Sequence, residues 1–239
     1  MLQESRRIII VMLTSDKVLE WARENKKRIV QDYLSECEYP RSDSPNVIFM
    51  AGAPGAGKTE FAKRLIPQLS VPPIHIDMDE IAKRIDDYNP KNSHLFRAGA
   101  TVILERLYDE AIDKGIDILM DGTFGHSKTI LNVERALKHR YNIRIYFISP
   151  DPFTAWNKTL DREIIEKRSI NAEQFVETYF HMLENLRKIN EKFGKHVPIS
   201  VVLKDDQNRL KDIIENISTV ENYLQPVLTR SQLIATIKS

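Results

Sequence analysis

Hydrophobic positions along the chain follow two different spacings. In residues 16–34 they recur every three or four positions among charged side chains, which predicts an amphipathic helix. Residues 47–50 form a continuous apolar run, as expected of a strand that is buried on both faces of a parallel sheet. Residues 36–45 lie between the two segments and are rich in proline, serine and charge, so they predict a linker.

The same two patterns alternate through the rest of the chain. Short apolar runs predict strands at residues 74–76, 116–120, 143–148 and 197–203. Helical spacing predicts helices at residues 95–113, 129–140, 152–166, 172–193 and 208–217, followed by a helical tail that Pro226 interrupts. Gly115 follows the first of these helices, where a glycine commonly ends a helix. Strands that alternate with helices predict an α/β fold with a doubly wound parallel sheet flanked by helices.

The composition is that of an ordinary globular chain and narrows the choice of partners. Of 239 residues, 35 are basic and 34 are acidic, so the net charge of +1 disfavours a long nucleic acid substrate or a membrane surface. The apolar run at residues 8–13 is shorter than the roughly 20 residues that cross a bilayer, and no small-residue cleavage pattern follows it. Cys37 is the only cysteine, which favours a reducing cytoplasmic setting.

Residues 52–59 match the phosphate-loop consensus G-x-x-x-x-G-K-[ST]. They are Gly52, Ala53, Pro54, Gly55, Ala56, Gly57, Lys58 and Thr59. In such a loop the backbone N–H groups surround a phosphate, Lys58 reaches the β- and γ-phosphates, and the Thr59 hydroxyl binds Mg²⁺. A buried strand precedes the loop and an apolar helical spacing follows it, and the chain lacks the N-K-x-D consensus of GTPases. We therefore expect ATP and Mg²⁺ as cofactors, with residues 46–239 as the nucleotide-binding domain and residues 1–45 as a helix and linker.

Acidic residues follow two of the predicted strands. In a parallel sheet, ligands bind at the carboxyl ends of the strands. Phosphoryl transfer needs a carboxylate to accept the proton of the acceptor hydroxyl, and we assign that role to Asp79. Asp121 is the candidate for holding the metal, although it could instead be a turn residue before Gly122. Asp77 is equally well explained as the N-cap of a capping box with Glu80.

Two arginines are candidates for a lid over the transferring phosphoryl group. Arg162 lies in a predicted helix, whereas Arg168 lies at a break before a new helix that Asn171 would cap and that has Gln174 at its third position. Guanidinium groups spread positive charge over phosphoryl oxygens, so we expect both arginines to act on the phosphate. The alternative is a surface ion pair of Arg162 with Glu166. The six histidines show no metal-ligand spacing.

In their order and spacing these segments resemble the zeta toxin family, the kinases of toxin–antitoxin systems, over roughly residues 48–190. The matching pieces are residues 52–59 and 76–79, Glu105, Asp121-Gly122-Thr123, Arg162 and Arg168. The resemblance implies a P-loop kinase-like fold with a helical lid and transfer of the ATP γ-phosphate to the 3′-hydroxyl of the sugar in UDP-N-acetylglucosamine or a related UDP-amino-sugar. It implies that Asp79 is the catalytic base and that Lys58 binds ATP. It also implies an antitoxin protein as partner, and the following residues as substrate contacts: Glu105, Asp121 and Thr123.

The acceptor and the role of the N-terminal helix stay open at this point. Family members carry an arginine closely after the Glu-Gly-Thr motif, whereas Asp121-Gly122-Thr123 is followed by Phe124-Gly125-His126. Lys128 is a candidate substitute. A kinase of a nucleoside, an antibiotic or a polynucleotide is therefore an alternative, as is an ATP-dependent binding switch. The helix at residues 16–34 either packs on the sheet or acts as an inhibitor in the same chain.

Overall fold

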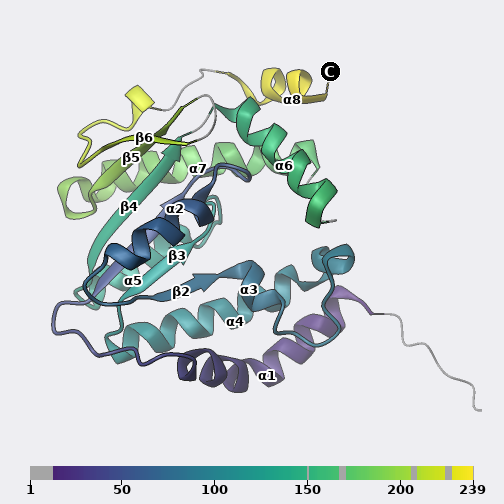
Figure 1. Ribbon diagram of the computed structural model, residues 1–239, viewed down its shortest axis with the longest axis vertical. Coiled ribbons are helices and arrows are strands. Elements are labelled where there is room, and N and C mark those ends of the chain that lie inside the picture. The colour runs from purple at the N-terminus through teal and green to yellow at the C-terminus, as the bar shows by residue number, and fades with distance from the viewer. Residues whose placement is uncertain (1–12, 150, 167–170, 206–208, 224–227, 239) are drawn as a thin grey trace, which may run out of the picture.

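A computed structural model of the chain describes residues 13–149, 151–166, 171–205, 209–223 and 228–238 (Figure 1). Its centre is a six-stranded sheet with the order β2-β3-β1-β4-β5-β6. The strands are β1 (Asn46–Ala51), β2 (Ile74–Asp77), β3 (Ile118–Asp121), β4 (Asn142–Ser149), β5 (Ile199–Lys204) and β6 (Leu210–Ile214). All neighbouring pairs are parallel except β5 and β6. The predicted α/β fold with a helix-flanked sheet is confirmed, and the sheet is mixed rather than wholly parallel.

Helices cover both faces of this sheet (Figure 1). They are α1 (Ser15–Ser35), α2 (Lys58–Leu65), α3 (Met78–Ala82), α4 (Ser93–Lys114), α5 (Thr129–Lys138), α6 (Pro152–Glu166), α7 (Ala172–Phe193) and α8 (Arg230–Lys238). On one face Phe61 and Ala62 of α2 pack against Ile48 and Met50 of β1. The larger core on the other face includes buried side chains of α1, α4, α5 and α7. Within the described ranges, the helices are all too short or too polar to cross a membrane.

The segment at residues 210–214 is the strand β6, so the helix predicted at residues 208–217 is wrong. Leu210, Ile213 and Ile217 do have helical spacing. However, β6 pairs with the edge of β5, which satisfies those of its backbone N–H and C=O groups that face β5. The hairpin is closed by Asp205, whose carboxylate accepts a hydrogen bond from the backbone N–H of Arg209 (2.8 Å). Tertiary pairing therefore overrides a local helical pattern.

The helical tail is confirmed in part. α8 spans Arg230–Lys238 and packs against α7. A short 3₁₀ helix spans Glu221–Tyr223. Residues 224–227, including Pro226, lie outside the described part of the chain.

The N-terminal helix α1 packs along α4 and belongs to the main hydrophobic core. Thr14 caps it by accepting a hydrogen bond from the backbone N–H of Lys17 (3.4 Å). The two helices approach closely at Gly99, where an added Cβ would lie 3.1 Å from side-chain atoms of both Ala22 and Val18. The packing role of the N-terminal helix is thereby supported.

Replacing Gly99 by leucine should destabilise the protein by about 3 kcal/mol, because a larger side chain forces α1 away from α4. Ala98→Leu is the matched control, because Ala98 lies on the exposed side of α4, and it should change stability by about 0.5 kcal/mol or less. Thermal and chemical unfolding measure both effects. Equal stability of the two variants would show that the α1–α4 contact is not tight.

Candidate active site

The phosphate loop connects β1 to α2 at the carboxyl edge of the sheet. Gly57 adopts a φ of 81°, which favours glycine, and it precedes the first turn of α2. Lys58 donates hydrogen bonds from Nζ to the carbonyl oxygens of Gly52 (3.1 Å) and Ala53 (2.8 Å). Thr59 follows in the same helical turn. The loop thus has the strand–loop–helix setting in which backbone N–H groups can bind phosphates.

Lys58 lies within the electrostatic reach of two other predicted site residues. Burial lowers the pKa of Lys58 to about 8. The negative charge of Asp121 opposes this lowering, and the positive charge of Arg162 adds to it. The fold therefore brings a residue of the loop, a strand end and α6 close together, although more than 100 positions separate Lys58 from Arg162 in the sequence.

Helix α6 lies directly against the phosphate loop. Gly55 has a φ of +75°, and an added Cβ there would overlap the carbonyl oxygen of Ala155 and lie 2.7 Å from Oγ1 of Thr159. Both of these residues are buried in α6. Asp151 caps the helix by accepting a hydrogen bond from the backbone N–H of Thr154 (2.8 Å). The position of α6 relative to the loop is consequently set by a contact that only glycine permits.

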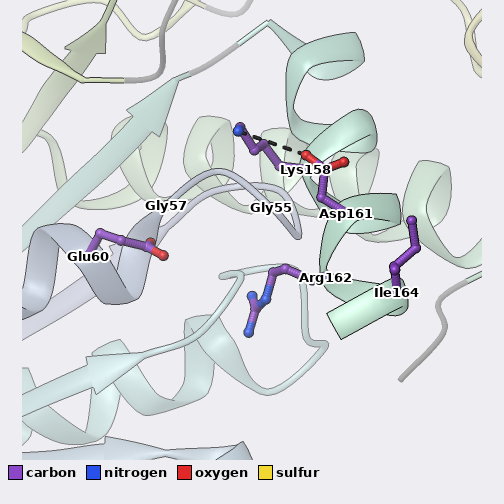
Figure 2. Close-up of a pocket in the computed structure, with 7 residues that line it drawn as sticks. All are labelled: Gly55, Gly57, Glu60, Lys158, Asp161, Arg162 and Ile164. Atoms are coloured by element: carbon purple, nitrogen blue, oxygen red, sulfur yellow. Dashed lines mark ion pairs between the residues drawn. The ribbon is translucent and has the colours of Figure 1, made fainter. Parts of the chain in front are cut away.

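A cavity of about 490 Å³ opens between the phosphate loop and α6 (Figure 2). Its lining consists of Gly55 and Gly57 from the loop, Glu60 from α2, and Lys158, Asp161, Arg162 and Ile164 from α6. Figure 2 shows the Arg162 side chain extending from α6 below the phosphate loop. Lys158 instead pairs with Asp161, with Nζ 3.8 Å from Oδ2. A cavity with backbone N–H groups on one wall and cationic side chains on the other can hold a phosphate chain.

The second helix of the predicted lid begins where expected. Asn171 caps α7 by accepting a hydrogen bond from the backbone N–H of Gln174 (2.7 Å), which confirms the predicted N-cap. Arg162 lies on α6, also as predicted. Arg168 belongs to residues 167–170, which lie outside the described residues.

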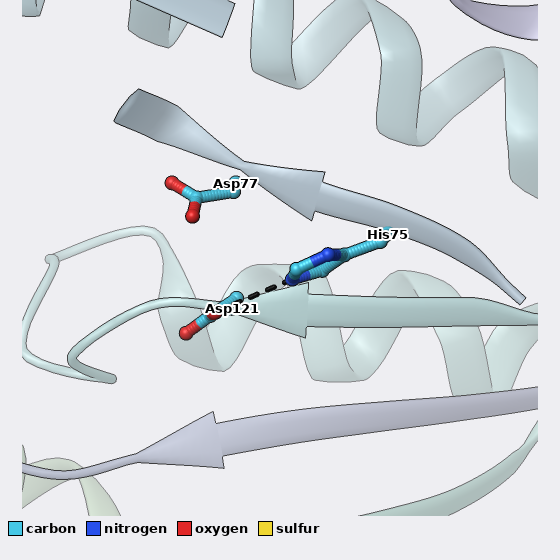
Figure 3. A group of neighbouring side chains, drawn as sticks. All are labelled: His75, Asp77 and Asp121. Carbon is cyan, nitrogen blue, oxygen red and sulfur yellow. Dashed lines mark hydrogen bonds and ion pairs between the residues drawn. The ribbon is translucent and has the colours of Figure 1, made fainter. Parts of the chain in front are cut away.

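Two acidic residues and a histidine meet at the ends of β2 and β3 (Figure 3). His75 and Asp77 are two residues apart in β2, so their side chains share one face of the sheet. Asp121 is paired with Asp77 in the register of the two strands. Nε2 of His75 lies 3.3 Å from Oδ2 of Asp121, whose side chain is only 3% exposed. One nitrogen and two carboxylate groups are thereby presented together at the edge where ligands bind.

Asp77 caps α3, and Asp79 lies in the first turn of that helix. The Asp77 carboxylate accepts a hydrogen bond from the backbone N–H of Asp79 (2.7 Å), which confirms the predicted N-cap. The other half of the proposed capping box is not seen in the described residues, since Glu80 pairs instead with Lys83 (2.6 Å). Burial raises the pKa of Asp77 to about 6, and the negative charges of Asp79 and Asp121 act in the same direction.

Asp77→Asn should stabilise the metal-free protein at neutral pH, because asparagine also caps helices but carries no charge. The pKa of Asp77 rises from 3.8 to about 6 on folding, so the wild-type carboxyl favours the folded state below pH 4 and loses that contribution as the pH rises through 6. Because the Asp77 carboxyl is partly exposed, the full pKa shift overstates its effect. We expect Asp77→Asn to raise the free energy of unfolding above pH 6 by about 1–2 kcal/mol. Thermal unfolding from pH 4 to pH 8 in EDTA measures the effect. A gain that is the same at both ends of this range would contradict the assigned cause.

Glu105, the predicted substrate contact on α4, is surrounded by cations of α5 and the segment before it. It accepts a hydrogen bond from Nη1 of Arg135 (3.0 Å) and lies 3.8 Å from Nζ of Lys128. Arg135 also lies over the ring of Tyr108, 5.0 Å from its centroid. The segment after β3 is bonded to the phosphate loop, because the carbonyl of Thr123 accepts a hydrogen bond from the backbone N–H of Gly52 (3.2 Å).

Three residues near these groups are not predicted as site residues by the sequence. His75 lies in the cluster with Asp77 and Asp121. The histidines have no metal-ligand spacing along the sequence, so the sequence did not point to His75. Lys204 ends β5 and places Nζ 3.5 Å from the carbonyl oxygen of Gly57. Arg135 lies 30 positions from Glu105 along the chain. Strand alternation from Asp77 and the position of Lys204 at a strand end could have indicated the first two, whereas nothing local marks Arg135.

A family model described as "Zeta toxin" matches residues 30–215 of this chain. Among solved structures, a chain of the PezAT chromosomal toxin–antitoxin system of the human pathogen Streptococcus pneumoniae is similar with a TM-score of 0.65 at 16% identity, covering 92% of this chain and 93% of that one. Structures of AvrRxo1-ORF1:AvrRxo1-ORF2, with sulphate ions and native, give TM-scores of 0.54 and 0.55 at 13% identity, covering 90% of this chain and 72% of theirs. Among curated proteins none matches. At these identities the likeness shows the fold alone.

Proposed function

Since this chain belongs to the zeta toxin family, we propose that it is an ATP- and Mg²⁺-dependent kinase of a small molecule. The preferred acceptor is the 3′-hydroxyl of the sugar in UDP-N-acetylglucosamine or a related UDP-amino-sugar. One observation carries the proposal: the strand-end residue Asp121 and the α6 residue Arg162 both act electrostatically on Lys58 of the phosphate loop, and Arg162 lines the cavity between this loop and α6. Phosphoryl transfer requires such a meeting of cations and carboxylates.

Each residue of this site has a proposed task. The phosphate loop and Lys58 bind the triphosphate, and Arg162 stabilises the negative charge that develops on the phosphoryl oxygens, together with Arg168 outside the described residues. Thr59 and Asp121 would hold Mg²⁺, which supplies charge neutralisation on the phosphates. Asp79, in the first turn of α3, accepts the proton of the acceptor hydroxyl.

The acceptor side of the site lies near Glu105, Asp121 and Thr123. A sugar nucleotide brings its own diphosphate, and cations must neutralise it. The structure places Arg135 (3.0 Å) and Lys128 (3.8 Å) beside Glu105, which supports Lys128 as the substitute for the arginine that this sequence lacks after Thr123. The carboxylate of Glu105 can hold such a cation in place and accept a hydrogen bond from a hydroxyl of the acceptor.

An acceptor screen tests the proposal. The purified chain is incubated with ATP and Mg²⁺ and with panels of UDP-sugars, nucleosides, antibiotics and short oligonucleotides, and products are identified by mass spectrometry. The Lys58→Ala chain, prepared in the same way, controls for contaminating kinases. Phosphorylated UDP-amino-sugar is the expected product, and a phosphorylated member of another panel would keep the kinase but replace its acceptor. ATP hydrolysis with no phosphorylated acceptor in any panel would favour a binding switch.

We also propose an antitoxin protein as partner. The PezAT structure comes from a toxin–antitoxin system, and the AvrRxo1-ORF1 structures contain ORF2. An inhibitory role of α1 is not favoured, because α1 packs into the core along α4 (Figure 1). If expression of the chain is toxic and Lys58→Ala removes the toxicity, the need for such a partner is supported.

A further inference from the structure

His75, Asp77 and Asp121 present a mixed set of metal ligands on adjacent strands. One ligand atom from each residue can be chosen so that all lie within 4.8 Å of one another. Nε2 of His75 and Oδ2 of Asp121 are 3.3 Å apart. Two ligands bound at right angles to one ion, each at about 2.1–2.2 Å, are roughly 3 Å apart. The His75–Asp121 pair therefore already has nearly the spacing of two neighbouring ligands, and a ligand oxygen of Asp77 lies within 4.8 Å of both.

The carboxylate of Asp121 is directed into this cluster. Its side chain is 3% exposed. Across the described ranges it accepts a hydrogen bond only from His75, which is itself a member of the cluster. A carboxylate has about four lone-pair sites, so most of its bonding capacity is not used by the protein. Burying a charged group is costly unless positive charge lies nearby; Lys58 acts on Asp121 electrostatically, and a bound cation would add a direct ligand contact.

The other two ligands are held in position by neighbouring elements. The backbone carbonyl of His75 accepts a hydrogen bond from the hydroxyl of Tyr33 on α1 (2.7 Å). One oxygen of Asp77 accepts the hydrogen bond from the backbone N–H of Asp79, and the second oxygen can still bind an ion. Helices α1 and α3 thus fix the strand end from which two of the three ligands come.

We propose that His75, Asp77 and Asp121 bind a first-row transition metal ion and prefer Mn²⁺ to Mg²⁺. Mg²⁺ prefers oxygen ligands and retains its waters, whereas an imidazole nitrogen adds affinity for transition metals. The cluster supplies one nitrogen and two carboxylates, which suits Mn²⁺ with its remaining positions on water or phosphate oxygens. Asp121 is common to this site and to the Mg²⁺ site that it would form with Thr59 at the triphosphate, and its two carboxylate oxygens can each bind one ion.

The role of the ion rests on the proposed function, since Asp121 also acts on Lys58 of the phosphate loop. An ion at the cluster would lie at the acceptor side of the triphosphate site and offset the negative charges of Asp77 and Asp121. Binding of the ion, however, requires neither ATP nor acceptor. It can therefore be measured even if the acceptor screen finds no product.

The test measures Mn²⁺ binding by EPR, from the loss of the signal of free Mn²⁺ on titration with protein that was stripped with EDTA and contains no nucleotide. We expect one Mn²⁺ per chain, and His75→Val should weaken its binding at least about tenfold because a ligand is lost. Asp121→Asn should have a similar effect. His139→Gln is the matched control, since His139 is exposed at the end of α5, and it should leave Mn²⁺ binding unchanged.

Competition with Mg²⁺ and thermal unfolding complete the experiment. Mn²⁺ should raise the Tm of the wild-type protein at concentrations where Mg²⁺ does not, and His75→Val should abolish this difference while its Tm without metal shows that it is folded. Two results would overturn the proposal: Mn²⁺ binding that His75→Val and Asp121→Asn leave unchanged, or Mg²⁺ that displaces Mn²⁺ at equal concentration. If Mn²⁺ binds as expected but no acceptor is phosphorylated, the metal site stands and the proposed kinase function fails.

Discussion

Asp79→Asn should lower the rate of phosphoryl transfer by about 10²–10⁴-fold, because asparagine cannot accept the proton of the acceptor hydroxyl. The substitution keeps the size of the side chain. It also keeps the backbone N–H of Asp79 that bonds to the Asp77 carboxylate, so α3 should remain capped. Binding of ATP should change little, since the proposed triphosphate contacts come from the phosphate loop and α6 rather than from α3. Transfer to the acceptor found in the screen and ATP binding by calorimetry measure the two effects.

The control for this variant is Asp86→Asn. Asp86 is exposed and follows α3 at a distance of seven positions from Asp79 along the chain, so removing its charge should not alter transfer. A rate of transfer that Asp79→Asn leaves unchanged would remove Asp79 as the base. Loss of ATP binding in the same variant would show that Asp79 contacts the nucleotide instead.

Gly55→Ala should weaken ATP binding at least about 100-fold, which corresponds to roughly 2.8 kcal/mol. A single methyl group at this position would overlap the backbone carbonyl oxygen of Ala155, and a backbone atom within a helix cannot rotate away. Either the phosphate loop must change its conformation or α6 must move off the loop. Both movements disturb the cavity that the two elements share.

Backbone strain alone would also affect Gly55→Ala, because its φ is +75°. Gly115→Ala separates strain from overlap. Gly115 has a φ of +66°, but an added Cβ would meet its nearest atom, Cγ of Arg41, at an ordinary 3.4 Å. We expect Gly115→Ala to cost about 1 kcal/mol of stability and to leave ATP affinity intact. Equal ATP affinities in the two alanine variants would contradict the proposed contact between the loop and α6.

Much of the fold follows from local features of the sequence. A buried parallel strand needs a continuous apolar run, and runs of this kind located β1 to β5. Helix ends depend on a few neighbouring residues, and the predicted caps at Asn171 and Gly115 are both present. The phosphate-loop consensus is equally local, because its glycines and Lys58 act within one turn of the backbone. These elements, their order and the family likeness could therefore be predicted without coordinates.

Other features depend on which segments meet in space. β6 has a helical spacing of apolar residues, but pairing with the edge of β5 decides its conformation. His75 joins the carboxylates only because β2 and β3 are adjacent and in register. Arg135 reaches Glu105 across two helices. Local patterns carry no information about such pairs, since each residue fits its own element equally well without the other.

The sequence by itself determined the phosphate loop, the alternation of strands and helices, and membership of a kinase-like family, because these depend on local motifs and on the order of those motifs along the chain. Only the tertiary structure decided which groups surround the loop. Packing brings Arg162 and Asp121 within electrostatic reach of Lys58, seats α6 on Gly55 and adds His75 to the carboxylates. Electrostatic and coordination chemistry depend on distances between atoms, and those distances are set by the packing of the whole chain.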